Sequence, residues 1–419
     1  MMGNLSSERS IDVSQAIEIA YRWARQADIE CQTETVYVSQ STSSITVNSS
    51  LLRDGRVLSQ ASGKGMGDAA LASAIFEAIE HAAIRKNLYR AIPPLRDAQL
   101  PRNKKIEAVD LGYKLARELR YPDTQPVEVF YELREDLSLN LDAPHLYPRI
   151  LADLSLPIGP YLGDLIPLSA YSTNTGTAAG TNWRDAILHG LNEVLERDAE
   201  SQFLLDVNMG HDSWCHLVLK EHDPLRLLLD ELTIKRGKNG ALLLLDSQAG
   251  FVVCAMSEPE PGGEAELGFG ASQSLRIAVE RAVTELQQIR SSIMQGSTWA
   301  DNGASAPNGL DGYPNMKKLA SRLFAIPKCS SEPIEVPEDV DFVGSPVSQL
   351  KSKGYLALGR LVWSDTIDLG SIVVAQALVP GLETLNNLIF NRPILPLGRL
   401  RSAANVDFLL EGAVNDFVR

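Results

Sequence analysis

Two pairs of glutamates stand out in the 419-residue chain, because each pair lies inside otherwise apolar sequence. The first pair is Glu77 and Glu80, and the second is Glu193 and Glu196. In a helix, this i, i+3 spacing places both carboxylates on one face. Carboxylates buried among apolar neighbours must be paired or bind a metal, and Mg²⁺ prefers oxygen ligands. We therefore predict that the four glutamates converge as ligands of Mg²⁺.

Each predicted acidic helix follows a segment rich in small residues, which we interpret as a loop. The first segment is Ser62-Gly63-Lys64-Gly65 and the second covers residues 174–180. Glycines let the backbone approach a phosphate, which backbone N–H groups at a helix N-terminus can bind. Lys64 could neutralise that phosphate, although the Walker A pattern is absent. Two such loops beside four carboxylates indicate a Mg²⁺–nucleotide site.

Simpler interpretations compete with each of these motifs. A single i, i+3 glutamate pair is usually a solvated helix face, and a glycine-rich segment is usually a turn. Arg197, Arg281 and Arg290 lie on the predicted acid-bearing helices, where they could pair with neighbouring glutamates or clamp phosphate oxygens. Because few charges surround either glutamate pair, we favour the nucleotide site.

Composition limits the classes of partner and compartment. The net charge of -14, from 39 basic and 53 acidic side chains, argues against broad binding of nucleic acids or anionic membranes. Neither a signal peptide nor a run of about 18 apolar residues is present, so we expect no membrane span. The four cysteines lack a CxxC pattern, which favours a reducing, cytoplasmic environment. A weak candidate metal cluster, whose spacing matches no known site, comprises His211, Cys215, His216 and His222.

Hydrophobic periodicity predicts a mixture of helices and strands. The predicted helices cover residues 12–27, 67–89, 105–119, 183–206 and 274–294. The predicted strands cover residues 35–38, 44–47, 56–58, 127–131, 241–246 and 250–256. Residues 300–315 and 330–341 are predicted loops. This mixture indicates a layered α/β or α+β fold, in which we expect three acid-bearing helices to converge on one cavity.

Three ordered blocks of sequence resemble the YcaO family. The first runs from Gly63-Lys64-Gly65 through Glu77 and Glu80, the second from Ala178 through Glu196-Arg197-Asp198-Ala199, and the third from Ala278 to Arg290. Pro380-Gly381-Leu382-Glu383 resembles a late family segment. Together the similar segments cover roughly residues 55–400. The chain departs from the family pattern at His81, Ala178, Asp185 and His189.

The resemblance implies a single YcaO-like domain, with mixed sheets and long helices around a central ATP–Mg²⁺ cavity. We expect this domain over residues 55–405, an N-terminal helix and strands over residues 1–54, and a tail over residues 406–419. The implied cofactors are ATP and Mg²⁺.

The resemblance also implies ATP-dependent activation of peptide backbone amides. A nucleophile adds to the amide carbonyl, and the resulting oxyanion attacks the γ-phosphate of ATP. With a Cys, Ser or Thr side chain as nucleophile, the product is a thiazoline or oxazoline in a ribosomally made peptide. External sulfide would give a thioamide, an alternative that the chain's proline-free last residues leave open. The departures from the family pattern motivate a further alternative, a non-catalytic scaffold subunit.

The resemblance carries site roles onto matching residues of this chain. It implies that Mg²⁺ is held by Glu77, Glu80, Glu193 and Glu196. The implied ATP-binding residues are Lys64, Ser73, Glu77, Glu80, Asp185, His189, Glu193, Glu196, Arg197, Arg281, Glu285 and Arg290. The implied catalytic residues are Glu196, Arg197 and Arg290. Asp198 leaves the face that carries Glu196, so we expect its neutral substitution to affect turnover less.

We also expect several partners. The substrate would be a precursor peptide, delivered by a partner protein that binds its leader because no separate leader-binding module is visible. A flavin dehydrogenase would accompany azole formation. The implied assembly is a homodimer or a hetero-complex.

Overall fold

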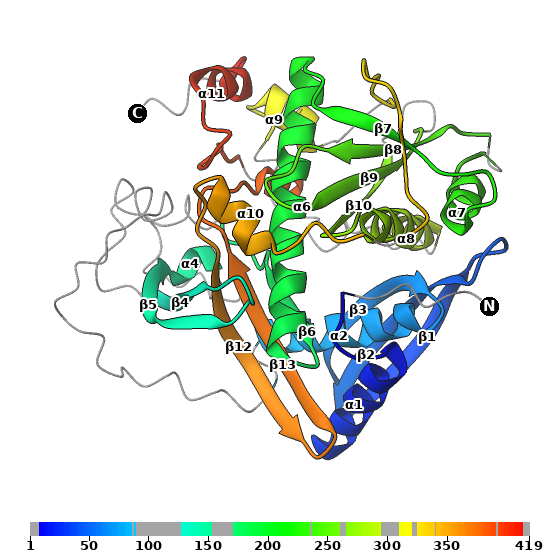
Figure 1. The fold of residues 1–419 in the computed structure, drawn as a ribbon, viewed down its shortest axis with the longest axis vertical. Coiled ribbons are helices and arrows are strands. Elements are labelled where there is room, and N and C mark those ends of the chain that lie inside the picture. Colours follow the sequence, from blue (N-terminus) through cyan, green and yellow to red (C-terminus); the bar gives the residue numbers. More distant parts are fainter. Residues whose placement is uncertain are drawn as a thin grey trace. The chain divides into compact units, whose positions relative to one another are not determined.

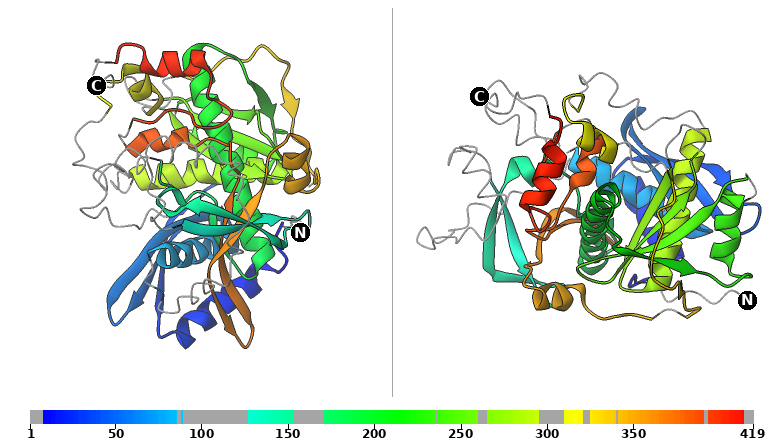
Figure 2. Two further views of the ribbon diagram at one scale, coloured as in Figure 1. Left: turned by 90° about the vertical axis from the view of Figure 1, so that its left-hand side faces the viewer. Right: turned by 90° about the horizontal axis from the view of Figure 1, so that it is seen from above.

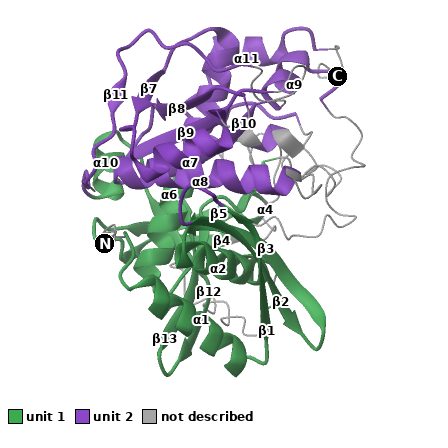
Figure 3. Cartoon of the chain, turned by 90° about the vertical axis from the view of Figure 1, so that its right-hand side faces the viewer, with its two compact units in different colours: residues 1–38, 44–194, 345–380 green, residues 39–43, 195–344, 381–419 purple. Residues whose placement is uncertain are grey.

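The computed structural model of the chain forms two compact units (Figures 1 and 3). Unit 1 comprises residues 1–38, 44–194 and 345–380, and unit 2 comprises residues 39–43, 195–344 and 381–419. The structure describes residues 8–85, 88, 127–152, 171–234, 237–259, 265–294, 310–320, 325–339, 341–390 and 393–413.

The first sheet of unit 1 is antiparallel, in the order β1-β2-β3. Its strands are β1 (Glu30–Val38), β2 (Ser44–Arg53) and β3 (Arg56–Met66). Helix α1 (Val13–Gln26) precedes these strands, and helix α2 (Asp68–Ile84) follows them. Strands β2 and β3 meet at Asp54-Gly55, where both residues have positive φ angles, as a two-residue Asp-Gly hairpin turn requires. Helix α2 packs against β2 and β3.

Gly63, Lys64 and Gly65 lie within strand β3, so the prediction of a glycine-rich loop at this point is wrong. The physical reason is close packing rather than chain flexibility. A Cβ atom at Gly63 would lie 2.0 Å from the backbone nitrogen of Ala74, so only glycine lets the strand approach α2 this closely.

The second sheet of unit 1 is also antiparallel and has the order β5-β4-β12-β13-β6. Its strands are β4 (Val127–Leu133), β5 (Leu139–Pro148), β6 (Thr177–Gly180), β12 (Leu358–Ile367) and β13 (Gly370–Leu378). The short helix α4 (Arg149–Ala152) follows β5, and the short helix α10 (Pro346–Ser352) precedes β12. The β12–β13 hairpin is visible in Figure 2. Its Trp363 ring packs edge-on against Trp23 of α1, with 5.6 Å between ring centroids. The core of unit 1 therefore joins segments from both ends of the chain.

Unit 2 contains a sheet in the order β10-β9-β8-β7-β11, in which only the β7–β11 pairing is parallel. Its strands are β7 (Trp214–Val218), β8 (Gly240–Leu245), β9 (Phe251–Ser257), β10 (Glu266–Ser272) and β11 (Ile334–Glu335). Its helices are α7 (Pro224–Leu232), α8 (Leu275–Met294), α9 (Pro314–Ala320), η4 (Leu385–Phe390) and α11 (Ala403–Leu410). Helix α8 packs on β9 and β10, and a Cβ atom at Gly268 or Gly270 would lie 2.3 or 2.4 Å from backbone atoms of α8, so these glycines permit the close approach.

The long helix α6 (Trp183–Met209) contributes its first residues to unit 1 and the remainder to unit 2. Asn182 precedes it and its side-chain oxygen accepts the backbone N–H of Asp185 at 2.9 Å, which satisfies one of the free donors at the helix start.

Most predicted elements are confirmed, as is the mixed α/β class. The helix predicted over residues 67–89 ends earlier, at Ile84, and β11 lies inside the predicted loop at 330–341. In the other predicted loop, α9 begins at Pro314, and residues 300–309 lie outside the described part of the chain. The predicted helix at 105–119 also lies outside it. The predicted domain boundaries near residues 54 and 405 stay predictions. None of the described helices has the length and apolar character needed to cross a bilayer.

Candidate functional site

Helix α2 presents Ser73, Glu77 and Glu80 at the edge of an apolar packing surface. Neighbouring positions such as Ile75 and Ile79 are buried in the core of unit 1, whereas the two glutamates and Ser73 are half-buried. The glutamate pair is therefore not a solvated face, as the apolar sequence around it predicted.

Glu193 of α6 joins the two glutamates of α2 in a group that we call the acid cluster: Glu77, Glu80 and Glu193. The pKa of Glu80 lies well above its usual value, because burial disfavours its charge and because Glu193 and then Glu77 add negative charge nearby. Glu80 and Glu193, more than 100 residues apart in sequence, thus lie close enough for their charges to interact. A divalent cation would offset that repulsion.

The backbone of Gly176 holds the Glu193 carboxylate. The Gly176 N–H donates to Glu193 Oε2 at 3.2 Å, and the Gly176 carbonyl accepts the N–H of Ala377 at 2.7 Å. Gly176 has φ +83°, and a Cβ atom on Gly190 would lie 2.2 Å from its carbonyl oxygen. The second small-residue segment, predicted as a loop, therefore contains strand β6, and its Gly176 orients a carboxylate.

Lys64, Asp185 and His189 also belong to unit 1, in different settings. Lys64 is half-buried on β3, and His189 is exposed on α6. The Asp185 carboxylate accepts hydrogen bonds from Ser10, whose hydroxyl lies at 2.7 Å, and from the Asn182 side chain at 3.0 Å. These bonds tie the N-terminal segment to the start of α6.

His81 stands where the family pattern has arginine. Its Nδ1 lies 3.0 Å from the carbonyl oxygen of Gln60. Burial is the main cause that lowers the pKa of His81, with the nearby positive charge of Arg85 acting in the same direction against that hydrogen bond. The departure from the family pattern thus replaces a permanent cation with a side chain that is largely neutral at pH 7.

The remaining predicted site residues belong to unit 2. The Glu196 side chain is only 12 % exposed and lies 3.7 Å from Arg197, which also pairs with Glu200 at 2.9 Å. On α8, Arg290 forms an ion pair with Glu266, Arg281 donates to the carbonyl of Ala271, and Glu285 is half-buried. Arg197 and Arg290 therefore pair with nearby glutamates, which is the simpler of their two predicted roles; the other is to clamp phosphate oxygens.

Within the described residues, no group of three or more His, Cys, Asp and Glu side chains is arranged to hold a metal ion. The weak His–Cys cluster is therefore not arranged to hold a metal ion, and its Cys215 sulfur accepts a hydrogen bond from Ser331 at 3.2 Å. The acid cluster accordingly shows interacting charges without a preformed coordination geometry. Because Glu196 belongs to the other unit, its convergence with the acid cluster stays a prediction.

Sequence reasoning gave no site role to a buried polar network in unit 2. Its members are Asp198, Glu383 and Arg399, and the two acids are 1 % and 4 % exposed. Arg399 pairs with Asp198 at 2.8 Å. Asp198 follows the Glu-Arg pair of the second block and Glu383 ends the late family segment, so the family resemblance could have pointed to these two residues. Nothing in the sequence singled out Arg399.

Comparison with protein families shows a match over residues 62–383 to the family described as YcaO cyclodehydratase, ATP- and Mg²⁺-binding. The chain belongs to the YcaO family, and both the resemblance and the predicted cofactors, ATP and Mg²⁺, are confirmed at this level. An uncharacterized protein of Methanothermobacter thermautotrophicus is 29 % identical over 228 residues, which cover 52 % of this chain and 58 % of that protein. The match therefore spans little more than half of the relative's length.

Solved structures share the fold at low identity. A YcaO protein from Methanopyrus kandleri bound with AMPPCP and Mg²⁺ is 19 % identical, with 94 % of this chain and 98 % of that chain covered and a TM-score of 0.60. A heterocyclase in complex with substrate and cofactor is 18 % identical, with 90 % and 53 % covered and a TM-score of 0.58. The E. coli microcin synthetase McbBCD complex is 14 % identical, with 84 % and 87 % covered and a TM-score of 0.55.

Proposed function

We propose that this protein is an ATP- and Mg²⁺-dependent enzyme that activates backbone amides of a ribosomally made peptide. The proposed reaction is cyclodehydration of Cys, Ser or Thr to a thiazoline or oxazoline. Family membership supports the ATP-dependent class. The observation that carries the proposal for this chain is the acid cluster, in which carboxylates from α2 and α6 act on one another's charge.

The donor set of the acid cluster suits Mg²⁺, which takes carboxylate oxygens together with phosphate oxygens of its nucleotide. Glu77, Glu80 and Glu193 would hold the ion, with Glu196 as a fourth ligand. When bound, Mg²⁺ would neutralise phosphate charge during transfer. The hydrogen bond from Gly176 fixes one oxygen of Glu193, as groups behind a metal ligand commonly do.

The positively charged residues would position and neutralise the phosphates. Lys64, Arg197, Arg281 and Arg290 would supply the charge, and Ser73 would donate to a phosphate oxygen or a water. Because the substrate supplies the nucleophile, positioning and charge neutralisation are the protein's main contributions. The remaining proposed nucleotide contacts are Asp185, His189 and Glu285.

The proposed substrate is a precursor peptide, presented by a leader-binding partner protein. Similar folds include the microcin synthetase complex with pro-MccB17 bound and a heterocyclase bound with substrate. A flavin dehydrogenase would act after cyclodehydration if the final product is an azole.

A non-catalytic scaffold is the second candidate. Its supporting observation is Asp185, whose carboxylate is engaged by Ser10 and Asn182. Binding of ATP in the presence of Mg²⁺ separates the two candidates, since a scaffold would bind none even with its partner present.

The test is nucleotide binding and turnover in matched variants. Glu196→Gln should abolish Mg²⁺-dependent ATP turnover while leaving the circular dichroism spectrum unchanged, because the amide keeps the shape but not the charge. Glu18→Gln, on the exposed face of α1, is the control and should behave as wild type. Normal turnover in Glu196→Gln would remove its proposed role as a metal ligand.

Product mass then identifies the reaction. Cyclodehydration removes about 18 Da per site and replacement of oxygen by sulfur adds about 16 Da, by the atom balance of each covalent step. A mass gain would replace cyclodehydration with thioamide formation.

A further inference from the structure

The part of helix α6 that belongs to unit 2 presents two different sets of side chains. Glu196 and Glu200 lie on one face, whereas Asp198 and Gln202 lie on roughly the opposite face, because successive helical residues are rotated by about 100°. Arg197 and Ser201, one turn apart, lie between these faces. Glu196 and Arg197 are proposed to act on Mg²⁺ and phosphate, whereas Asp198, Ser201 and Gln202 are engaged by the chain beyond residue 380.

Asp198 is the central residue of the second set. Arg399 Nε donates to both of its carboxylate oxygens, at 3.0 and 2.9 Å, and Arg399 Nη2 lies 2.8 Å from Oδ2 as an ion pair. Asp198 also accepts the backbone N–H of Glu383 at 2.9 Å. Because a guanidinium and a carboxylate are both planar, this pairing fixes direction as well as distance. This pair therefore constrains rotation of α6 about its axis.

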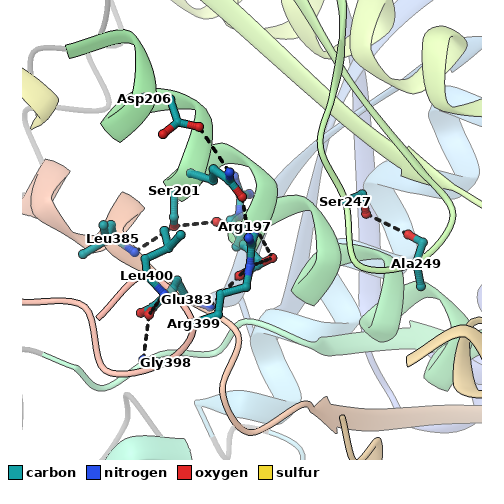
Figure 4. A network of polar contacts seen from close by, with 12 residues as sticks. Arg197, Ser201, Asp206, Ser247, Ala249, Glu383, Leu385, Gly398, Arg399 and Leu400 are labelled. Atoms are coloured by element: carbon teal, nitrogen blue, oxygen red, sulfur yellow. Dashed lines mark hydrogen bonds and ion pairs between the residues drawn. The ribbon is translucent and has the colours of Figure 1, made fainter. Parts of the chain in front are cut away.

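Two further bonds connect α6 to the same stretch of chain. The Ser201 hydroxyl accepts the N–H of Leu385 at 2.9 Å, and Arg399 donates to the side chain of Gln202. Figure 4 shows Ser201 and Arg197 on α6 beside Leu385, Glu383 and Arg399. Contacts one turn apart on the helix fix its position along the axis as well as its rotation.

The stretch that holds α6 is itself fixed by Glu383. The Glu383 carboxylate accepts backbone N–H groups of Gly398 at 2.6 Å, Leu400 at 3.1 Å and Leu397 at 3.1 Å. A Cβ atom on Gly398 would lie 2.1 Å from the carbonyl oxygen of Gly381, so the two ends of the stretch touch backbone to backbone. Glu383 thus holds residues 397–400 in place, and Arg399 among them reaches Asp198.

We propose that Asp198, Arg399 and Glu383 are positioning residues that hold Glu196 and Arg197 in the orientation needed for the Mg²⁺–nucleotide complex. This inference rests on the proposed function. The physical requirement is a tight one, since a small rotation of α6 would displace the Glu196 carboxylate, and loosely held sites lose activity.

The decisive variant is Arg399→Lys, which retains the positive charge beside Asp198 but loses the planar guanidinium and its Nε–H donor. We expect the dissociation constant for ATP in the presence of Mg²⁺ to rise about tenfold, the low end of the cost of altering groups behind metal ligands. Amide hydrogen exchange measured without nucleotide should rise at residues 397–400 and in α6 near Glu196. Arg401→Lys, an exposed arginine two residues further on, is the matched control and should leave both measurements unchanged.

Glu383→Gln provides a second variant, because the amide nitrogen replaces an acceptor of backbone N–H groups with a donor. It should weaken nucleotide binding in the same direction as Arg399→Lys. If folded Arg399→Lys and Glu383→Gln proteins bind MgATP as wild type does while Glu196→Gln does not, the positioning role is overturned and the proposed function stands. If Glu196→Gln also binds normally, the proposed metal-ligand role of Glu196 has failed, and absence of MgATP binding by the wild-type protein would overturn the proposed function itself.

Discussion

Asp198 and Glu383 of unit 2 lie among hydrogen-bond donors and an arginine, whereas Glu80 of unit 1 lies near two other carboxylates. All three have a raised pKa, and burial is the largest cause in each case. The additional influences differ. Arg399 and a backbone N–H lower the pKa of Asp198, and three backbone N–H groups lower that of Glu383, with a nearby acid as the last and opposing cause in each case. For Glu80, the charges of Glu193 and Glu77 both raise the pKa further.

This difference separates acids that the folded chain itself partners from the acids proposed to bind Mg²⁺. In unit 2 the protein supplies the compensation for buried negative charge, so those acids contribute to the folded state. In unit 1 the nearby acids add to the cost of ionising Glu80, which is the arrangement expected where an external cation completes the site. Acidic residues whose pKa is raised mainly by burial should therefore respond differently to mutation in the two units.

The largest effect should follow from breaking the compensated pair. Asp198→Asn should destabilise the fold by about 3–5 kcal/mol, because it leaves the Arg399 guanidinium without its buried counter-charge. Urea denaturation would measure the change. In the double variant Asp198→Asn/Arg399→Gln, part of the stability should return, and a simple sum of the two single losses would argue against a coupled pair.

Neutral substitution in the acid cluster should have the opposite consequence, a loss of activity without a loss of stability. Glu80→Gln should lower ATP turnover by at least a hundredfold, about 2.7 kcal/mol of transition-state stabilisation, yet keep or raise the melting temperature because it removes one of several like charges. Parallel turnover assays and thermal melts would check this. A clearly lower melting temperature of Glu80→Gln would show that Glu80 stabilises the fold, as we expect of Asp198 and Glu383 in unit 2.

Disturbing the close backbone approach between Gly190 and Gly176, which orients Glu193, should have a smaller effect on stability. Gly190→Ala should destabilise the protein by about 1–3 kcal/mol, because the added Cβ atom meets the Gly176 carbonyl. This sign opposes the intrinsic helix preference for alanine. Gly312→Ala is the control, since a Cβ atom there meets open space. Stability unchanged in both variants would contradict the close approach.

The smallest effect is a pH dependence from Glu383. Burial raises the pKa of Glu383 to about 7, against the ordinary 4.5, so the folded state holds a proton that the unfolded chain releases. Stability from this group is present below pH 4.5 and is lost as pH rises through 7, by about 1 kcal/mol between pH 6 and 8. Denaturation at both pH values should show a shallower decline in Glu383→Gln. An equal decline would assign the dependence to other groups.

Much of the fold followed from local sequence. Periodicity predicted α1, α6 and α8 and the strands around them, and the apolar neighbours of Glu77 and Glu80 predicted their partial burial. Periodicity failed where glycine was the guide, at Gly63 and in residues 174–180. Glycine in sequence signals either a turn or a close backbone approach, and only the packing partner distinguishes them.

The sequence by itself determined which residue types could bind Mg²⁺ and phosphate, because spacing along a helix fixes the face that each glutamate shares. Tertiary structure alone decided which acids would meet one another and which would meet a cation. Glu80 finds Glu193 and Asp198 finds Arg399 across more than 100 residues of chain. Such pairings depend on how distant segments pack, and no local pattern encodes the distance between two side chains that the fold brings together.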